Sequence, residues 1–283
     1  IDSPDIPLNV SRSYLQADGN VKKISSYITR KVADKLKSLF TNNREDFQNK
    51  WNDIKIVLEY GMLTDEKFYE KAGDFVLYPT TDGQYYTLSE LKEAIKANQT
   101  DKNDTLVVLY AQNKEQQYTA IEEAKAKGYQ VVLLDSPIVS HLIQKLEEKN
   151  EKLTFARVDA APLSKLIQKD EPILAKHSEE EKNTLKTDIE KVLPKEGYMV
   201  QIEDLDSDDT PFVINQPEFM RRMKEMSATG GGGMFGAFPE MYHVVVNANA
   251  PLADAILAAD EAAKEKLIKQ AFDLARLSQG LLK

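Results

Sequence analysis

The sequence predicts a chain of mixed class, with an α/β part followed by an α+β part. Up to about residue 100 the apolar residues recur at helical spacing, and from residue 105 to 158 apolar strand-like runs alternate with helical segments. The remaining residues mix strands and helices without that alternation. We therefore expect a helical segment and a small three-layer αβα unit in residues 1–162, and an α+β domain in residues 163–283.

The first part opens with helices. A long helix is predicted where apolar residues recur every three or four positions, at Val21, Ile24, Ile28, Val32, Leu36 and Phe40. A second helix, expected to end at Gly61, carries Phe47, Trp51, Ile54 and Leu58. Thr64 or Asp65 then caps a short helix, and a capping box at residues 87 to 90 starts another.

The αβα unit begins at a continuous apolar run, residues 105 to 110, which predicts a strand buried on both faces. A helix over residues 114 to 127, a strand over 130 to 134, a helix from Pro137 and a strand over 153 to 158 follow. This alternation implies parallel strands with right-handed crossovers. The turn at residues 111 to 114 lacks the glycines of a nucleotide-binding loop, so we exclude that function for the unit.

The second part follows a stretch rich in Asp, Ala, Pro and Lys, residues 159 to 177. Ser178 and Glu181 form a capping box for a helix that reaches Leu193. Strands are predicted over residues 198 to 202, 212 to 214 and 242 to 246, and two closing helices from 251 and over 261 to 278. Residues 204 to 208 begin like a calcium loop, but Asp209 stands where glycine is needed, so we expect a solvated hairpin loop.

Composition limits the possible functions. The chain has 283 residues with 37 Lys and Arg against 46 Asp and Glu, and this net charge of −9 argues against nucleic acid as a partner. No apolar run is long enough to span a membrane and no signal peptide opens the chain, so we expect no membrane partner. The lack of cysteine fits a reducing cytoplasm. His141, His177 and His243 are too widely separated to predict a metal site.

One predicted helix, residues 216 to 227, has a flexible apolar face. The residues on that face are Phe219, Met220, Met223 and Met226. We expect Arg221, Arg222 and Lys224 on the opposite, polar face. Because Met adapts its shape, such a face suits unrelated apolar partners, but the spacing alone fits an ordinary core helix as well. A glycine run at residues 230 to 233 favours a loosely tethered helix.

The last predicted helix has a broad apolar face near the end of the chain. The positions that we assign to assembly are Leu267, Ala271, Leu274 and Leu277. This face packs either within its own domain or against a second chain in a two-fold helical bundle. Leu281 and Leu282 follow without an element of their own, and the chain starts at Ile1 inside a motif, so we expect a fragment of a longer protein.

The opening residues carry the most specific functional signal. Prolines at positions 4 and 7 hold the backbone extended, and Asn9, Arg12 and Gln16 lie where the loop turns into a helix. A guanidinium there can bind a phosphate or carboxylate carried on another surface. The run DIPLNVSRSYLQ, residues 5 to 16, closely resembles the catalytic loop of the heat-shock protein 90 chaperone family, with Ile6 in place of Leu.

This resemblance extends along the chain and implies both a function and partners. The chain resembles the later part of that family's middle domain and its C-terminal dimerisation domain. The resemblance implies that Arg12 contacts the γ-phosphate of ATP held by an absent N-terminal domain, with Asn9 and Gln16 supporting the loop. ATP and Mg²⁺ would then bind only in the full-length protein, so the fragment alone would be no ATPase.

The resemblance also assigns the two apolar helices. The Met-rich helix would contact unfolded client proteins, and the last helix would hold a homodimer, whose bundle a further helix completes. Two other functions stay open when only the residues, and not the resemblance, are considered. One is a non-enzymatic scaffold in which Arg12 is purely structural. The other, a standalone enzyme, is disfavoured because neither a glycine loop nor a catalytic cluster accompanies the αβα unit.

Overall fold

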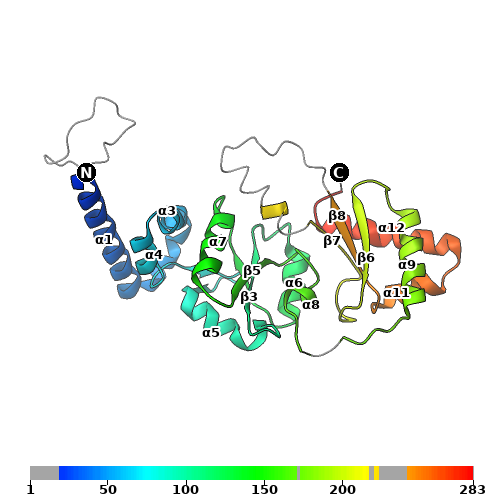
Figure 1. Ribbon diagram of the computed structural model, residues 1–283. Helices are drawn as coiled ribbons and strands as arrows, with labels where there is room; N and C mark the ends of the chain where they lie inside the picture. Colours follow the sequence, from blue (N-terminus) through cyan, green and yellow to red (C-terminus); the bar gives the residue numbers. More distant parts are fainter. Residues whose placement is uncertain (1–18, 171–172, 217–219, 223–240, 283) are drawn as a thin grey trace, which may run out of the picture. The chain divides into compact units, whose positions relative to one another are not determined.

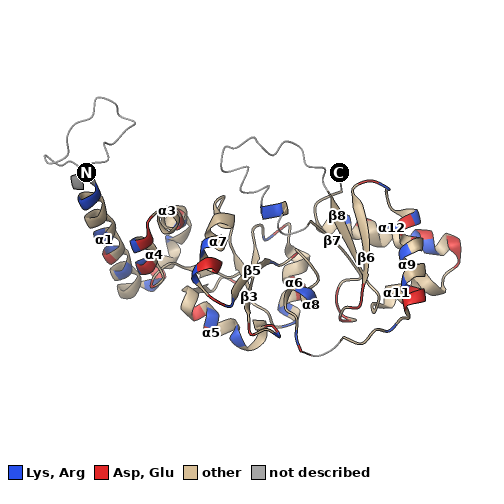
Figure 2. Ribbon diagram, in the orientation of Figure 1, with Lys and Arg blue, Asp and Glu red and all other residues tan. Residues whose placement is uncertain are grey.

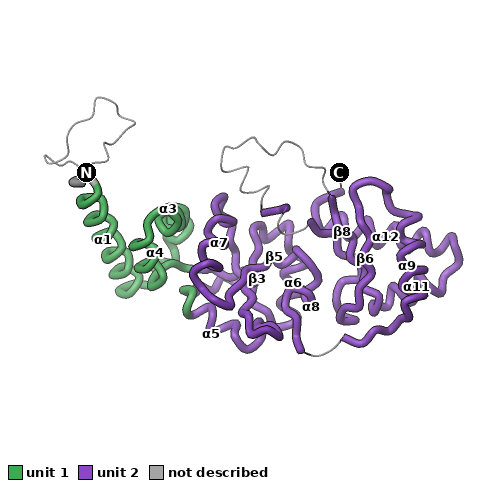
Figure 3. The backbone as a smooth tube through the Cα atoms, viewed as in Figure 1, with its two compact units in different colours: residues 1–77, 87–89 green, residues 78–86, 90–283 purple. Residues whose placement is uncertain are grey.

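The computed structural model describes residues 19–170, 173–216, 220–222 and 241–282. The chain forms two compact units, which Figure 3 shows in different colours. The smaller unit comprises residues 1–77 and 87–89, and the larger comprises residues 78–86 and 90–283. The predicted domain boundary after residue 162 lies inside the larger unit and stays a prediction.

The smaller unit is helical, as predicted. It contains α1 (Gly19–Asn42), α2 (Arg44–Asn49), α3 (Trp51–Thr64) and α4 (Glu66–Ala72). Its core is aromatic, because the ring of Phe47 lies 6.4 Å from those of both Trp51 and Phe75, and Phe68 lies 6.2 Å from Phe75. Asp65 caps α4 by accepting the backbone N–H of Phe68, which confirms one of the two predicted caps.

Gly61 does not end a helix, which corrects the prediction. It lies inside α3, which continues to Thr64. A Cβ on Gly61 would lie 3.0 Å from two ring carbons of Phe68, so the missing side chain lets that ring pack directly on the helix backbone. The glycine therefore serves close packing between α3 and α4 instead of helix termination.

The larger unit begins with a two-stranded ribbon, β1 (Tyr78–Pro79) and β2 (Tyr85–Tyr86), and the helix α5 (Leu88–Gln99). The αβα part follows as β3 (Leu106–Ala111), α6 (Tyr118–Ala126), β4 (Val131–Leu133), α7 (Val139–Lys149), β5 (Leu153–Arg157) and α8 (Leu163–Leu166). Its strands are parallel in the order β4-β3-β5. Helix α6 lies on one side of the sheet and α7 on the other, as Figure 1 shows, so the predicted three layers are confirmed.

Helix α6 starts at Tyr118, four residues later than predicted. Asn113 accepts the backbone N–H groups of Glu115 and Gln116, and this turn competes with an earlier helix start. Gln117 accepts the N–H of Gln112 and also that of Asn113, which closes the loop after β3. The loop geometry is therefore set by side-chain amides that the apolar pattern does not reveal.

The C-terminal part of the larger unit is α+β, as predicted. Its elements are α9 (Glu179–Val192), β6 (Tyr198–Glu203), β7 (Phe212–Asn215), β8 (Tyr242–Asn247), α11 (Pro251–Ala258) and α12 (Glu261–Ser278). The capping box of Ser178 and Glu181 is present at α9. One core joins the sheet to all three helices, with Ile189 from α9, Ile256 from α11 and Phe272 from α12.

The acidic segment after β6 does not form the predicted hairpin. Strand β8 lies between β6 and β7, parallel to β6 and antiparallel to β7. The segment is held by Asn247 of β8, whose side-chain amide donates to the carbonyl of Asp206 at 2.7 Å and accepts the N–H of Leu205 at 3.4 Å. The prediction was wrong because strand order depends on β8, which comes much later in the chain.

Candidate functional site

The sequence-predicted site residues are only partly within the described chain. Asn9, Arg12 and Gln16 lie outside it, as do Phe219, Met223 and Met226. The structure does describe residues 220 to 222 as helical, with Met220 half-buried. It also describes all four assembly positions on α12. These residues point to two candidate sites in the larger unit. One is the surface of the αβα part that residues 220–222 contact, and the other is a pocket beside α12.

Arg221 joins its segment to the core of the αβα part. Only 5% of Arg221 is exposed, and its Nη2 donates to the hydroxyl of Tyr110 at 2.7 Å. The guanidinium also lies 5.9 Å from the centre of the Tyr110 ring, within the range of cation–π attraction. Tyr110 belongs to β3 and is fully buried. Arg221, which the sequence pattern places on the face opposite the methionines, is therefore buried against the αβα part.

Arg222 makes a second connection to the same part. Its Nη1 donates to Glu147 of α7 at 2.9 Å, and its Nη2 donates to the carbonyl oxygen of Phe155 in β5 at 2.8 Å. Glu147 also accepts the N–H of Phe155 at 2.7 Å and the hydroxyl of Thr154 at 3.1 Å. One guanidinium and one carboxylate thus join the segment, α7 and β5. Figure 2 shows the blue segment that carries both arginines.

A third connection pairs α6 with the segment between β6 and β7. The ammonium of Lys127 lies 2.8 Å from Asp209 and 3.2 Å from Asp206. The Asp209 side chain is only 2% exposed, and its second oxygen accepts the N–H of Ser164 at 3.3 Å. Burial disfavours the charged form of Lys127, but its hydrogen bonds to the carboxylates of Asp209 and Asp206, together with their negative charges, outweigh burial and raise the pKa of Lys127. The N–H of Asp208 and, to a smaller extent, Lys127 lower the pKa of Asp206.

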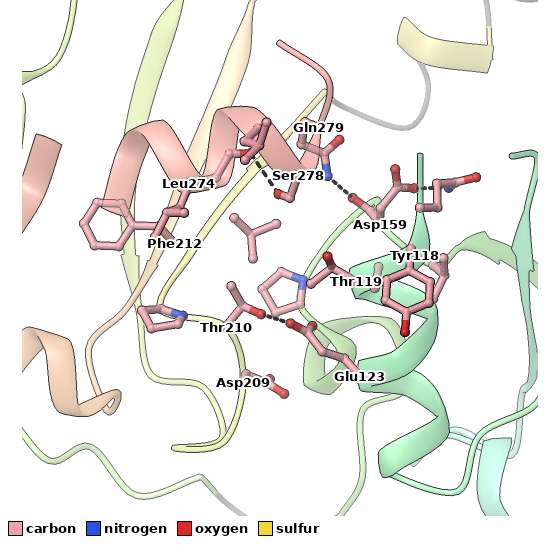
Figure 4. A pocket seen from close by; sticks show the side chains of 18 of the residues that line it. Tyr118, Thr119, Glu123, Asp159, Asp209, Thr210, Phe212, Leu274, Ser278 and Gln279 are labelled. Carbon is pink, nitrogen blue, oxygen red and sulfur yellow. Dashed lines mark hydrogen bonds between the residues drawn. The ribbon is translucent and has the colours of Figure 1, made fainter. Parts of the chain in front are cut away.

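A pocket of about 630 Å³ opens between α6, residues 158 to 163, the start of β7 and the C-terminal end of α12. Figure 4 shows Phe212 and Leu274 on one side and Glu123 and Asp159 on the other. The carbonyl of Asp159 accepts the Gln279 amide at 3.4 Å, which ties the end of α12 to the αβα part. No Lys or Arg lines this pocket among the described residues.

The four assembly positions separate into two kinds. Leu267 and Ala271 are partly buried against the core of their own domain. Leu274 and Leu277 are 66% and 61% exposed and line the pocket. The C-terminal end of α12 therefore presents an uncovered apolar surface in the described chain, whereas the middle of the helix packs on its own sheet.

The three connections were missed by sequence reasoning. Tyr110 alone could have indicated such a contact. It is the last residue of the apolar run 105 to 110, and a buried tyrosine hydroxyl needs a hydrogen-bond partner. The sequence did not identify that partner, which lies 111 residues further along the chain. Among the described residues, no group of His, Asp and Glu side chains is arranged to hold a metal ion. Within the same residues, no helix combines the length and apolar character that crossing a membrane requires.

The comparisons with known proteins agree on one family. The model of the family described as "Hsp90 protein" matches residues 1–281. The chain is 46% identical over 269 residues to "Chaperone protein HtpG" of Porphyromonas gingivalis, which covers 94% of this chain and 39% of that protein. It is likewise 46% identical over 267 residues to the protein of the same name from Bacteroides thetaiotaomicron, covering 93% of the chain and 39% of the relative. The chain thus spans about two fifths of the length of these relatives.

Proposed function

Because the chain belongs to the Hsp90 family, we propose that it forms the later portion of an ATP-dependent molecular chaperone that binds unfolded or partly folded proteins. The observation that carries this proposal is the family match along residues 1–281. The chain matches only 39% of the length of its relatives, so the ATP-linked activity belongs to a longer protein in this proposal. The site of action is the cytoplasm.

In this function Arg12 contacts the γ-phosphate of ATP, which an N-terminal domain holds together with Mg²⁺. Asn9 and Gln16 support the loop that carries this arginine. A guanidinium suits the role because it stays charged and can offset the charge that develops during phosphoryl transfer. The chain is mixed with a separately produced N-terminal ATPase domain, and ATP turnover is measured for wild type and Arg12→Ala. Equal turnover would support the scaffold alternative.

Clients bind to the apolar face that includes Met220, with Phe219, Met223 and Met226 on the same face. The test is light scattering from a heat-unfolding model protein in the presence of the chain. Burying a new carboxylate against an apolar client is unfavourable, so Met220→Asp should abolish suppression of aggregation. Met199→Asp is the matched control, because Met199 is 46% exposed on β6, away from this segment in the sequence. Equal suppression by both variants would refute client contact at Met220.

Homodimerisation uses the exposed end of α12, at Leu274 and Leu277. Their exposure supports this assignment, because large apolar side chains that lie side by side on one helix stabilise an interface when they are buried. The half-buried Leu267 and Ala271 support the helix from its own domain. The dimer brings two client surfaces into one particle, which raises the effective concentration of one for a client already bound to the other.

A further inference from the structure

We propose that Arg221 and Arg222 are positioning residues that hold residues 220–222, called the Met220 segment, against the αβα part, so that Met220 is held in place before a client arrives. This inference rests on the proposed client contact at Met220. It assigns a role to two arginines that the sequence pattern places opposite the apolar face. Neither arginine needs to touch the client for this role.

The burial of Arg221 supports a positioning role. We call the contacts of Arg221 and Arg222 with the αβα part the anchor. A guanidinium on a solvated helix face keeps its water at no cost, whereas a buried one must replace that water with protein acceptors. Arg221 is 5% exposed and donates to the hydroxyl of Tyr110, which is itself fully buried in β3. This hydrogen bond gives the buried guanidinium an acceptor, and separating the two groups would leave the buried hydroxyl without this donor.

The geometry of Arg222 indicates that it also sets the orientation of the Met220 segment. Its two terminal nitrogens reach different elements, one the carboxylate of Glu147 on α7 and the other the carbonyl of Phe155 on β5. The donors of a planar guanidinium point in fixed directions, so bonding both acceptors fixes the orientation of the segment as well as its distance. The side chains of Arg222 and Glu147 are each 22% exposed, which limits the screening of their attraction by solvent and salt.

Fixing the segment in advance favours client binding. A free segment would lose conformational freedom when a client binds, and that loss would weaken the complex. Because the arginines already order the segment, less conformational freedom is lost when a client binds. Breaking these arginine contacts should therefore weaken client binding although no apolar residue is replaced.

The first measurement tests the anchor itself. Tyr110→Phe removes the acceptor of Arg221, and Glu147→Gln removes the negative charge and one acceptor oxygen that face Arg222. Both variants keep Arg221 and Arg222 as trypsin cleavage sites. Losing a charge-assisted hydrogen bond should raise the rate of trypsin cleavage after Arg221 and Arg222 by roughly tenfold in each variant. The matched controls are Tyr118→Phe, at an exposed tyrosine, and Glu148→Gln, whose carboxylate accepts from Gln144. Unchanged cleavage in both anchor variants would overturn the proposal.

The second measurement tests the consequence for clients. In the light-scattering assay, the anchor variants should need several times more chain than wild type for half suppression, and the controls should match wild type. Urea unfolding of each variant identifies any general loss of stability, and Tyr110→Phe is the decisive variant if Glu147→Gln is unfolded. Faster cleavage with unchanged suppression would overturn the positioning role. If Met220→Asp has no effect, the proposed client contact fails and the positioning role fails with it, whatever the cleavage rate.

Discussion

Replacing Lys127 by Met should lower the free energy of unfolding of the larger unit by about 2 kcal/mol at neutral pH. The ammonium lies 2.8 Å from Asp209, whose side chain is 2% exposed, so its removal leaves a buried carboxylate with the Ser164 N–H at 3.3 Å. Breaking one side of a fully buried ion pair typically costs 3–5 kcal/mol. We expect a smaller loss because the Lys127 side chain is 25% exposed and Asp206, its second partner, is 49% exposed.

The pH dependence of this loss follows from the two pKa shifts. Burial alone would lower the pKa of Lys127, but the hydrogen bonds that Lys127 donates to Asp209 and Asp206, with their charges, raise it overall. A raised pKa contributes stability that is fully present below the unfolded value, about 10.4, and is lost as pH rises through the folded value. The pKa of Asp206 is lowered, so its contribution is present above about 3.9 and is lost as pH falls through the folded value. The difference between wild type and variant should therefore be largest between about pH 5 and 9.

Urea unfolding followed by far-ultraviolet circular dichroism across this pH range measures the difference. The control is Lys152→Met, because the Lys152–Asp104 pair spans 3.6 Å with side chains 63% and 86% exposed. An exposed pair of this kind contributes less than about 1 kcal/mol. A Lys127→Met loss no greater than that of the control, or one that does not shrink above pH 10, would refute the account of Lys127 as a buried anchor.

Three further predictions concern other elements. Gly61→Ala should destabilise the smaller unit by about 1 kcal/mol in thermal unfolding, because crowding against the Phe68 ring outweighs the better helix propensity; a gain in stability would contradict this. Ser178→Ala should cost about 1 kcal/mol by removing the capping box of α9, measured by urea unfolding; an unchanged midpoint would count against it. Leu277→Asp should weaken self-association at least tenfold in sedimentation velocity, and equal association constants would reject the α12 interface.

Much of the secondary structure could be predicted because it depends on local patterns. The apolar run of β3 and the capping box of α9 appear as predicted. The failures occurred where a distant or polar group determines the outcome. Gly61 lies inside a helix because Phe68 of the next helix needs its space, and α6 begins late because Asn113 binds backbone N–H groups that a longer helix would use.

The candidate site was harder to predict for a related reason. Spacing predicts an apolar face that includes Met220 and places the neighbouring arginines opposite it, but it does not show what the arginines contact. Their partners, Tyr110 and Glu147, lie 111 and 75 residues away, so no local pattern connects them. A helical wheel shows which residues share a face, but it does not show whether the polar face meets water or another part of the protein.

The order of the C-terminal sheet has a consequence for synthesis. Strand β8 is central, yet it is the last of the three strands in the chain, and residues 216 to 241 separate it from β7. A nascent chain that has not yet emerged past Asn247 therefore holds two strands that cannot pair as in the finished sheet, and their edges stay open to wrong contacts.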